Sequence, residues 1–408
     1  MPFPACVPAL TDAVVRLRAH RAGDVDRITE QSNDPESVRW TTVPQPYAAE
    51  PAREFLALIE TAWGEARGHR YWAICAADDP AETYLGTIDL RPRGAGMATV
   101  GFGLHPAGRG RHLMAAALRL VCRWWFDQGG VRVHWTANRG NFASWLVAWA
   151  CGFTWHGTTP GQLPQRGELL DAWTASLAAG EPMRPAAPWS EPPVLGRGAG
   201  DGARGAGAGA GGNKDAGRRE GSGDSAAVAD AIRVPGATIV LRPWRDDDTA
   251  VAQRHTHPPH YLPARAVPTP ETFTEWLLRA RERMAQGRSL NWCIGDAHTD
   301  DPLGEVLIFV HEEHLGAVDT AELGYWLRPD ARGRGLAEAA ARLAVDHALG
   351  PVADGGLGLR RLVAVTAADN TASNTVLERC GFTRWGHEAT ATAPDGSVGP
   401  ADHWERVR

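Results

Sequence analysis

Two parts of this sequence repeat one another, and they flank a tract that is too poor in apolar residues to fold. Residues 182–233 consist mainly of glycine, alanine and charged residues. Such a composition buries too little apolar surface to offset the entropy lost on ordering, so we predict a disordered, flexible Gly/Ala-rich linker. A chain of 408 residues suits two or three domains. We therefore predict one domain over 11–180, the linker over 181–236 and a second domain over 237–408.

The repeated segments occur in the same order in both copies. The matching pairs are 15–18 with 239–242, 71–74 with 291–294, 100–106 with 323–329, 141–144 with 370–373, and 151–153 with 380–382. Alternating apolar residues in some of these segments predict strands. Between other segments, apolar residues recur with a helical period and predict helices. The order strand, helices, strands, helix, strand, helix, strand predicts an α/β fold of the α+β kind. Each copy would be a mixed sheet with flanking helices, so the chain would hold two tandem domains of one fold.

Charge and composition narrow the classes of function. The formal net charge of −6 argues against a DNA-binding protein. The second copy holds more acidic residues than arginines, which favours a cationic substrate such as an amine, although a solvated acidic surface explains it equally. No run of about 18 apolar residues predicts a membrane span, and the N-terminus lacks a signal-peptide pattern, so we expect a cytoplasmic protein. The scattered cysteines lack metal-ligand spacing, and we expect no metal.

The most informative motif lies at 324–337, in the second copy. An apolar strand runs to Pro329, two glycines and two arginines follow, and a helix with one apolar face begins near Leu336 and stops at 350–351. A helix N-terminus offers unpaired N–H groups and partial positive charge to a phosphate. Gly335 would let those groups approach a pyrophosphate closely, and Arg332 and Arg334 would add charged donors. The alternative is a solvated Arg/Gly turn.

At this point the sequence resembles the GNAT superfamily of N-acetyltransferases. The family's acetyl-CoA motif, Arg/Gln-x-x-Gly-x-Gly/Ala, is matched by Arg332, Gly335 and Ala337. A second family motif, Asn-x-x-Ser/Ala followed by Gly-Phe, is matched by Asn370 and Ser373 with 381–382. The strand at 321–327 is similar to that of RimJ/RimL-type protein N-terminal acetyltransferases.

The resemblance implies a role for each matched position. Acetyl-CoA would be the co-substrate. A backbone N–H near Leu327 would polarise the thioester carbonyl, as in an oxyanion hole. The residues implied to bind the cofactor are Trp326, Leu327, Arg332, Gly333, Arg334, Gly335, Leu336, Ala337 and Asn370.

The resemblance also suggests which groups move protons. Many family members use a tyrosine to protonate the leaving thiolate, but Leu377 stands at that position here. We carry the acid role to Ser373, whose alternative role is to stabilise the helix start. The attacking amine must lose a proton, and Glu322 is our candidate base; it could instead bind the cationic substrate or lie on the outer face. His387 and Glu305 are weaker candidates.

The first copy departs from the motif. Arg109, Gly110 and Arg111 are kept, but His112 stands in the place of Gly335 and Thr99 in the place of Glu322. Asn141 and Ser144 of the second motif survive. We therefore predict the same fold in the first copy, with weaker or absent cofactor binding.

Together these features predict an acetyl-CoA-dependent N-acetyltransferase. It would move an acetyl group by direct attack to a primary amine, either a protein N-terminus or a small molecule. Two alternatives stay open. One is a non-catalytic acyl-CoA-binding or regulatory protein, and the other transfers a different acyl group, including one carried by tRNA.

Overall fold

The computed structural model of the chain forms two units, Met1–Pro188 and Trp189–Arg408. It describes residues 6–65, 68–186, 192–195, 233–234, 237–252, 258, 260–263, 265–310 and 319–408. Most of the expected linker at 181–236 lies outside the described residues. Among the described residues, no helix combines the length and the apolar character that crossing a bilayer requires.

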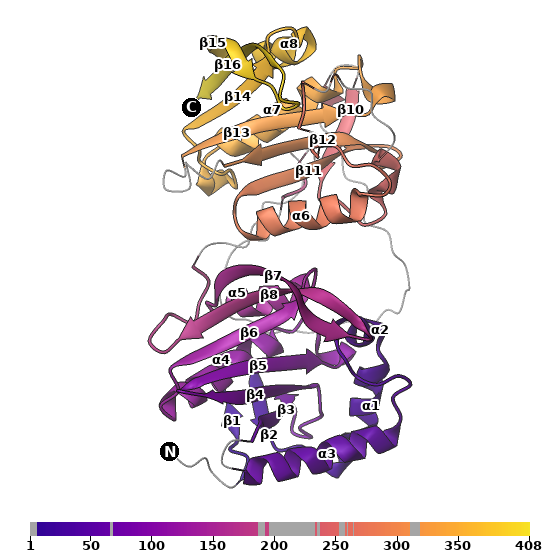
Figure 1. The fold of residues 1–408 in the computed structure, drawn as a ribbon, viewed down its shortest axis with the longest axis vertical. Coiled ribbons are helices and arrows are strands. Elements are labelled where there is room, and N and C mark those ends of the chain that lie inside the picture. Colours follow the sequence, from indigo (N-terminus) through magenta and orange to yellow (C-terminus); the bar gives the residue numbers. More distant parts are fainter. Residues whose placement is uncertain are drawn as a thin grey trace, which may run out of the picture. The chain divides into compact units, whose positions relative to one another are not determined.

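The first unit is a sheet of eight strands in the order β1-β2-β3-β4-β5-β6-β8-β7 (Figure 1). Its strands are β1 Leu10–Thr11, β2 Val15–Arg18, β3 Arg70–Ala76, β4 Gly86–Gly94, β5 Met97–Leu104, β6 Arg132–Asn138, β7 Thr154–Gln165 and β8 Glu168–Ala178. Its α-helices are α1 Val25–Asn33, α2 Pro35–Trp40, α3 Ala49–Gly64, α4 Leu113–Asp127 and α5 Phe142–Ala150. Only β5 and β6 pair in parallel among the described strands of this sheet.

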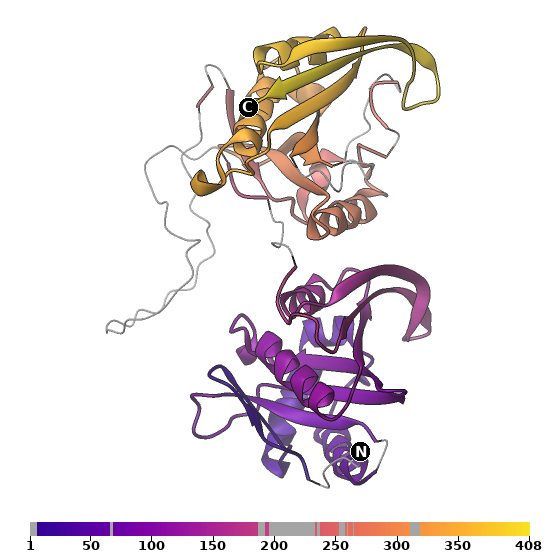
Figure 2. The same cartoon turned by 90° about the vertical axis from the view of Figure 1, so that its left-hand side faces the viewer.

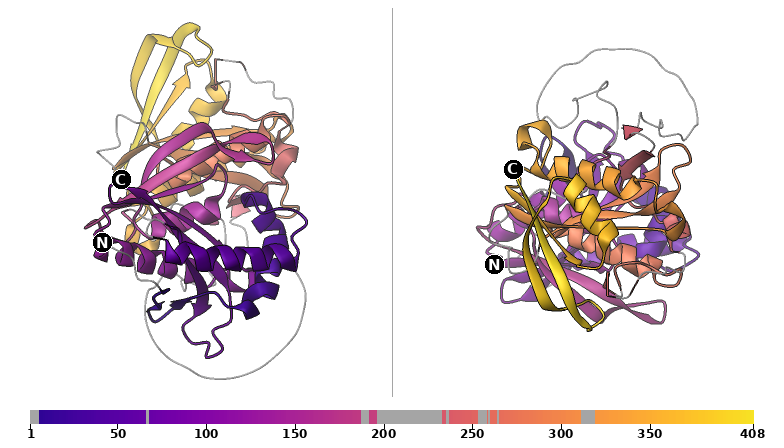
Figure 3. Two further views of the ribbon diagram at one scale, coloured as in Figure 1. Left: turned by 60° about the horizontal axis from the view of Figure 1, so that its bottom comes forward. Right: turned by 90° about the horizontal axis from the view of Figure 1, so that it is seen from above.

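The second unit repeats this order from β9 to β15. Its strands are β9 Arg233–Val234, β10 Ala237–Arg242, β11 Ser289–Asp296, β12 Pro302–Phe309, β13 Thr320–Leu327, β14 Arg361–Ala367, β15 Thr383–Thr392 and β16 Val398–Val407. Its α-helices are α6 Phe273–Ala285, α7 Leu336–Leu349 and α8 Thr371–Arg379. The β15–β16 hairpin (yellow) reaches beyond the body of this unit (Figures 2 and 3). The predicted fold class, two copies of a mixed sheet with flanking helices, is confirmed.

Helices cover both faces of the second sheet (Figure 1). Small residues of α7 such as Ala340 and Ala344 are fully buried against apolar residues of β10 to β14, so this helix packs closely on one face. Helix α6 packs Phe273 and Trp276 on the other face, beside Trp326 of β13. The sheet therefore separates two layers of helices, α7 on one face and α6 on the other.

The parallel strands at the centre of each sheet pair over only part of their length. β13 pairs with β14 only from Thr320 to Glu322, and β5 pairs with β6 only from Met97 to Val100. The later residues of β13, up to Leu327, have no ladder partner on the β14 side among the described residues. The backbone groups there can bond an extended ligand, as an exposed sheet edge bonds a peptide.

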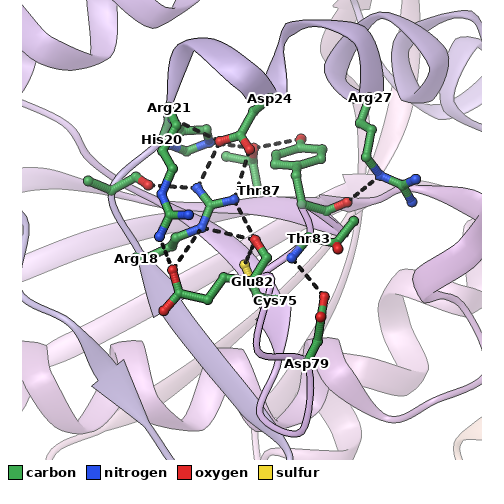
Figure 4. Close-up of polar contacts among 12 residues, drawn as sticks. Arg18, His20, Arg21, Asp24, Arg27, Cys75, Asp79, Glu82, Thr83 and Thr87 are labelled. Atoms are coloured by element: carbon green, nitrogen blue, oxygen red, sulfur yellow. Dashed lines mark hydrogen bonds and ion pairs between the residues drawn. The ribbon is translucent and has the colours of Figure 1, made fainter.

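A buried ion pair is repeated in both units and was not predicted from the sequence. In the first unit Arg18 donates two hydrogen bonds of 2.8 Å to the Asp24 carboxylate and others to the carbonyl of Glu82 (Figure 4). In the second unit Arg242 holds Asp248 through two bonds of 2.8 Å. Each pair fixes the turn after the first long strand, so it supports the fold and not the chemistry.

Residues 192–195 pair with the sheet of the second unit. Leu195 bridges Leu241, and the indole of Trp292 donates to the Pro193 carbonyl at 2.7 Å. The first unit has the same arrangement, in which Leu10 pairs with Leu17 and Trp72 donates to the Pro8 carbonyl. The domain limits stay a prediction, and we propose that the second domain takes in Pro193 and Leu195 as its first strand.

Candidate functional site

The corner at 328–335 joins a strand to a helix, as the sequence predicts. β13 ends at Leu327, a short turn follows at Pro329–Ala331, and α7 begins at Leu336 with Gly335 as its N-cap. Gly333 and Gly335 have φ angles of 72° and 74°, the left-handed region that favours glycine. A Cβ placed on Gly335 would meet no described atom within 4 Å. No side chain at Gly335 obstructs the start of α7, and the first amides of a helix lack partners within the helix, so a phosphate could bind there.

The two arginines of the corner are exposed with it. Arg332 turns back toward the end of the strand, where its Nε donates to the Leu327 carbonyl at 3.3 Å. That contact ties the guanidinium to the last residue of β13. The corner thus combines helix amides with two cationic side chains, which is a donor set for a diphosphate.

A cleft of about 950 Å³ lies along β13 and β14. Four of the predicted site residues line it: Glu322, Trp326, Asn370 and Ser373. Glu305, a weaker candidate, lines it as well. The predicted residues that do not line the cleft are Leu327, Arg332, Gly333, Arg334, Gly335, Leu336 and Ala337, which form the corner beyond the end of β13.

His387 lies apart from this cleft. It stands on β15, where its Nδ1 is 2.7 Å from the Asp402 carboxylate. His387 and Arg384 hold the pKa of Asp402 below its usual value. Because His387 does not line the cleft, the structure gives it no access to an acceptor there.

Ser373 has a partner that sequence reasoning missed. The hydroxyl oxygens of Tyr325 and Ser373 are 2.8 Å apart, and both side chains line the cleft. Burial raises the pKa of the Tyr325 phenol. Leu377, at the position where many family members have a tyrosine, is 1% exposed and packs in the core. The aromatic hydroxyl near Ser373 is therefore that of Tyr325 on β13. In the sequence, only the alternation of residues along this strand could have indicated Tyr325.

Asn370 has a clear structural role. It is the N-cap of α8, and its side-chain oxygen accepts a hydrogen bond from the Ser373 N–H at 3.2 Å. Asn141 caps α5 in the first unit in the same way, through the Ser144 N–H at 3.1 Å. The shared motif therefore fixes a helix start in both units.

Glu305 is the most deeply buried carboxylate in the cleft. It is 3% exposed, and the Asn291 amide and the Trp326 indole donate to its two oxygens at 2.8 and 3.0 Å. Burial raises the pKa of Glu305 to about 7, although these donors oppose the shift. Glu322 is half-buried on the same face of the sheet, opposite Phe309.

The corner of the first unit has the same backbone and a different charge balance. His112 is the N-cap of α4 at a φ of 58°, and Gly110 has a φ of 71°, so the turn is kept. Arg109 forms an ion pair with Asp34, the N-cap of α2, and this lowers the pKa of the Asp34 carboxyl. Arg111 is exposed beside it. The Asp34 carboxylate therefore already pairs with Arg109, the arginine whose counterpart in the second unit would bind a diphosphate.

In the described parts of the chain, no three His, Cys, Asp or Glu side chains gather in a way that could hold a metal ion.

Comparison with known proteins assigns the family. The model of the Acetyltransferase (GNAT) domain matches residues 15–154 and 238–383, more than half of the chain. The chain belongs to the GNAT acetyltransferase family and is an acyltransferase with two such domains. Among curated proteins, none matches it.

Solved structures of the family resemble one unit at a time. A GNAT-family acetyltransferase from Bacillus anthracis is 14% identical with a TM-score of 0.37, and the match covers 42% of this chain and 98% of that one. RimJ of Mycobacterium smegmatis, in complex with CoA-disulfide, is 17% identical with a TM-score of 0.39, and the match covers 43% and 90%.

Proposed function

We propose that the second unit transfers an acetyl group from acetyl-CoA to a primary amine by direct attack. The observation that carries the proposal is the open glycine corner at the start of α7, beside a cleft that holds Glu322 and Ser373. Its exposed amides, Arg332 and Arg334 would bind the diphosphate of CoA. Acetyl-CoA is then a co-substrate, and the acceptor is a small-molecule amine or a protein N-terminus.

The part of β13 that lies beyond its ladder with β14 would bind the pantetheine arm. Among the described residues this ladder stops at Glu322, so N–H and C=O groups farther along β13 could bond the amides of the arm. The backbone N–H at Trp326 or Leu327 would donate to the thioester oxygen and stabilise its negative charge during attack. Asn370 would flank the arm from the start of α8.

Two proton transfers complete the reaction. The amine nitrogen bonds to the acetyl carbon, the C–S bond breaks, and its electron pair leaves with the CoA sulfur. Ser373 would protonate that thiolate and recover a proton from Tyr325, 2.8 Å away, and Tyr325 would in turn take up a proton from solvent. A carboxylate of the cleft would take the proton from the amine, and Glu322 is the residue that the sequence favours for this or for binding the ammonium.

Thiol release with the full-length chain tests this function. Acetyl-CoA would be mixed with a panel of small amines and N-terminal peptides, and free CoA thiol and acetylated product would be measured. We expect product with at least one amine and calorimetric binding of one acetyl-CoA per chain. Binding of acetyl-CoA without turnover on any amine would favour the non-catalytic alternative.

Replacing Tyr325 by phenylalanine should lower kcat by about tenfold and leave KM for acetyl-CoA nearly unchanged. The change removes only the hydroxyl that returns a proton to Ser373, and positioned proton transfer contributes factors of this order or more. Steady-state kinetics with a thioester whose leaving thiol is more acidic provide the check, because that substrate needs less protonation and should recover most of the rate. An equal loss with both thioesters would point to a structural role.

Two changes together should improve acetyl-CoA binding to the first unit. Asp34→Asn keeps an N-cap side chain for α2 and removes the charge that pairs with Arg109. His112→Gly opens the start of α4. We expect the double variant to bind acetyl-CoA about tenfold more tightly than the parent, a gain of roughly 1.4 kcal/mol. Calorimetry in a Gly335→His background isolates this unit, and unchanged binding would contradict the charge argument.

A further inference from the structure

Glu305 is a buried carboxylate for which the described residues provide no direct ion pair, although Arg283 of α6 lowers its pKa through its charge. The Asn291 amide and the Trp326 indole, which donate hydrogen bonds to it, are both neutral. Each carboxylate oxygen can accept more than one hydrogen bond, so a further donor can approach from the cleft. A buried charge without a cationic partner is costly. A cationic ligand bound beside Glu305 would offset this free-energy cost.

The sheet register places Glu305 at the level where acyl transfer would occur. Glu305 lies opposite Trp326, one residue before the end of β13, whereas Glu322 lies opposite Phe309. Four residues separate Trp326 from Glu322, or about 13 Å at the rise of a strand. Both carboxylates face the same side of the sheet, because pleated strands alternate. A base must lie within hydrogen-bond reach of the nitrogen, directly or through one water, and Glu305 fits that condition better.

The surroundings of Glu305 indicate what carries the amine. Aromatic side chains line this cleft from three elements and the segment before α6: Tyr261, Trp276, Phe309 and Trp326. Aromatic faces attract ammonium groups and cover apolar bodies. A cleft of about 950 Å³ is of the size that encloses a small molecule, and it must also admit the end of the pantetheine arm.

We infer that Glu305 is the catalytic base for the acceptor, and that the acceptor is a small amine carried on an aromatic or apolar body. This inference rests on the proposed function of the second unit. The ammonium gives one proton to the Glu305 carboxylate, and the neutral amine attacks the thioester carbon. The second proton leaves the nitrogen for solvent as the C–S bond breaks, and the thiolate takes up one proton from Ser373, which is replaced from solvent through Tyr325. Glu305 then releases its proton to solvent.

The first unit lacks this group. Thr87 stands at the equivalent place of β4, since Gly86 pairs with Leu104 as Gly304 pairs with Leu327. The Thr87 hydroxyl is 2.9 Å from both the His20 ring and the Tyr84 hydroxyl, so it is already used within the fold. The carboxylate is therefore present only in the second unit, in which the corner at 328–335 keeps Gly335.

Among the other titratable groups near Glu305, Arg283 of α6 lowers the pKa of its carboxyl. Glu322 lines the same cleft. Cys293, on the neighbouring strand, is buried with a raised pKa and stays neutral. The base is active only when ionised, so kcat/KM should fall as the pH drops below about 7.

Glu305→Gln and Glu322→Gln, which compare the two candidate bases, test the inference in the full-length chain. The assay measures kcat/KM from pH 5.5 to 9 for phenethylamine, tryptamine, butylamine and a short peptide with a free N-terminus. We expect the aromatic amines to be preferred. Glu305→Gln should lower kcat/KM by about 100-fold and remove the rise near neutral pH, a larger loss than the one that Glu322→Gln causes. Glu305→Asp, which keeps a carboxylate, should recover part of the rate.

Binding of acetyl-CoA separates the possible failures. Glu305→Gln should bind acetyl-CoA as the parent does, which shows that the unit is folded. The inference is overturned if Glu322→Gln causes the larger loss, if the pH profile survives in Glu305→Gln, or if the peptide is the preferred acceptor. In those cases acetyl transfer still occurs and the proposed function stands. Absence of transfer to every amine by the parent chain overturns the proposed function itself.

Discussion

Replacing Gly335 by histidine should weaken acetyl-CoA binding to the second unit by between about tenfold and a hundredfold. The change reproduces the first unit, where His112 holds the same left-handed position at the start of α4. Histidine tolerates that backbone, so the fold should survive with a cost of about 1–2 kcal/mol. The space beside Gly335 is empty of described atoms, so the new ring would lie where the diphosphate approaches the helix amides. Calorimetric titration of acetyl-CoA gives the change directly.

Gly355 provides the control for backbone strain. It has a φ of 82°, it ends the short turn Val352–Asp354, and a Cβ there would also meet no described atom within 4 Å. It does not line the cleft. Gly355→His therefore carries a similar strain away from the proposed diphosphate site and should keep the affinity for acetyl-CoA. Equal losses in both variants would mean that strain, and not obstruction of the ligand, explains the effect.

The sequence predicts those features that depend on neighbouring residues. The strand, glycine turn and helix at 324–337 are local, because strand alternation, left-handed glycines and a helix period each involve only a few successive positions. The repeat adds the sheet order, since two copies of one pattern should adopt one fold. These parts of the prediction agree with the structure.

Features that depend on strand register could not be predicted in the same way. The approach of Trp326 and Asn291 to Glu305 exists because β12 pairs with β13 and β11 in one register out of several. A shift by one residue would turn Glu305 to the other face. The sequence favours Glu322 over Glu305 as the base, but a single strand does not show what lies opposite each residue.

The pairing of Arg109 with Asp34 could not be predicted either, because it depends on residues that are far apart in the sequence. It joins a turn to the N-cap of a helix that lies far earlier in the chain. The sequence pointed to His112 as the reason for weak cofactor binding, and the structure adds an anionic neighbour. The two effects can be separated by the Asp34→Asn and His112→Gly variants, because only the first changes charge.

Replacing Asp248 by alanine should destabilise the second unit by about 3–5 kcal/mol, the range found when one partner of a buried ion pair is removed. Arg242 is 4% exposed and would stay charged at any pH that the fold tolerates. It would lose two charged hydrogen bonds of 2.8 Å and keep its bonds to Asp300 and the Pro243 carbonyl. Hydrogen exchange followed by mass spectrometry resolves the two units, and we expect faster exchange in peptides of β10 to β14 only.

Two further variants test whether the loss of stability depends on the burial of the ion pair. Asp24→Ala removes the equivalent partner of Arg18 and should cause a loss of similar size, confined to peptides of the first unit. Arg360→Ala breaks a pair with Asp319 in which both side chains are largely exposed, and should leave the stability of the second unit nearly unchanged. If Asp248→Ala and Arg360→Ala had equal effects, the pair would be an ordinary surface contact. If Asp248→Ala alone unfolds the second unit, its buried arginine needs that carboxylate, and the repeat of the pair in both units is explained by folding.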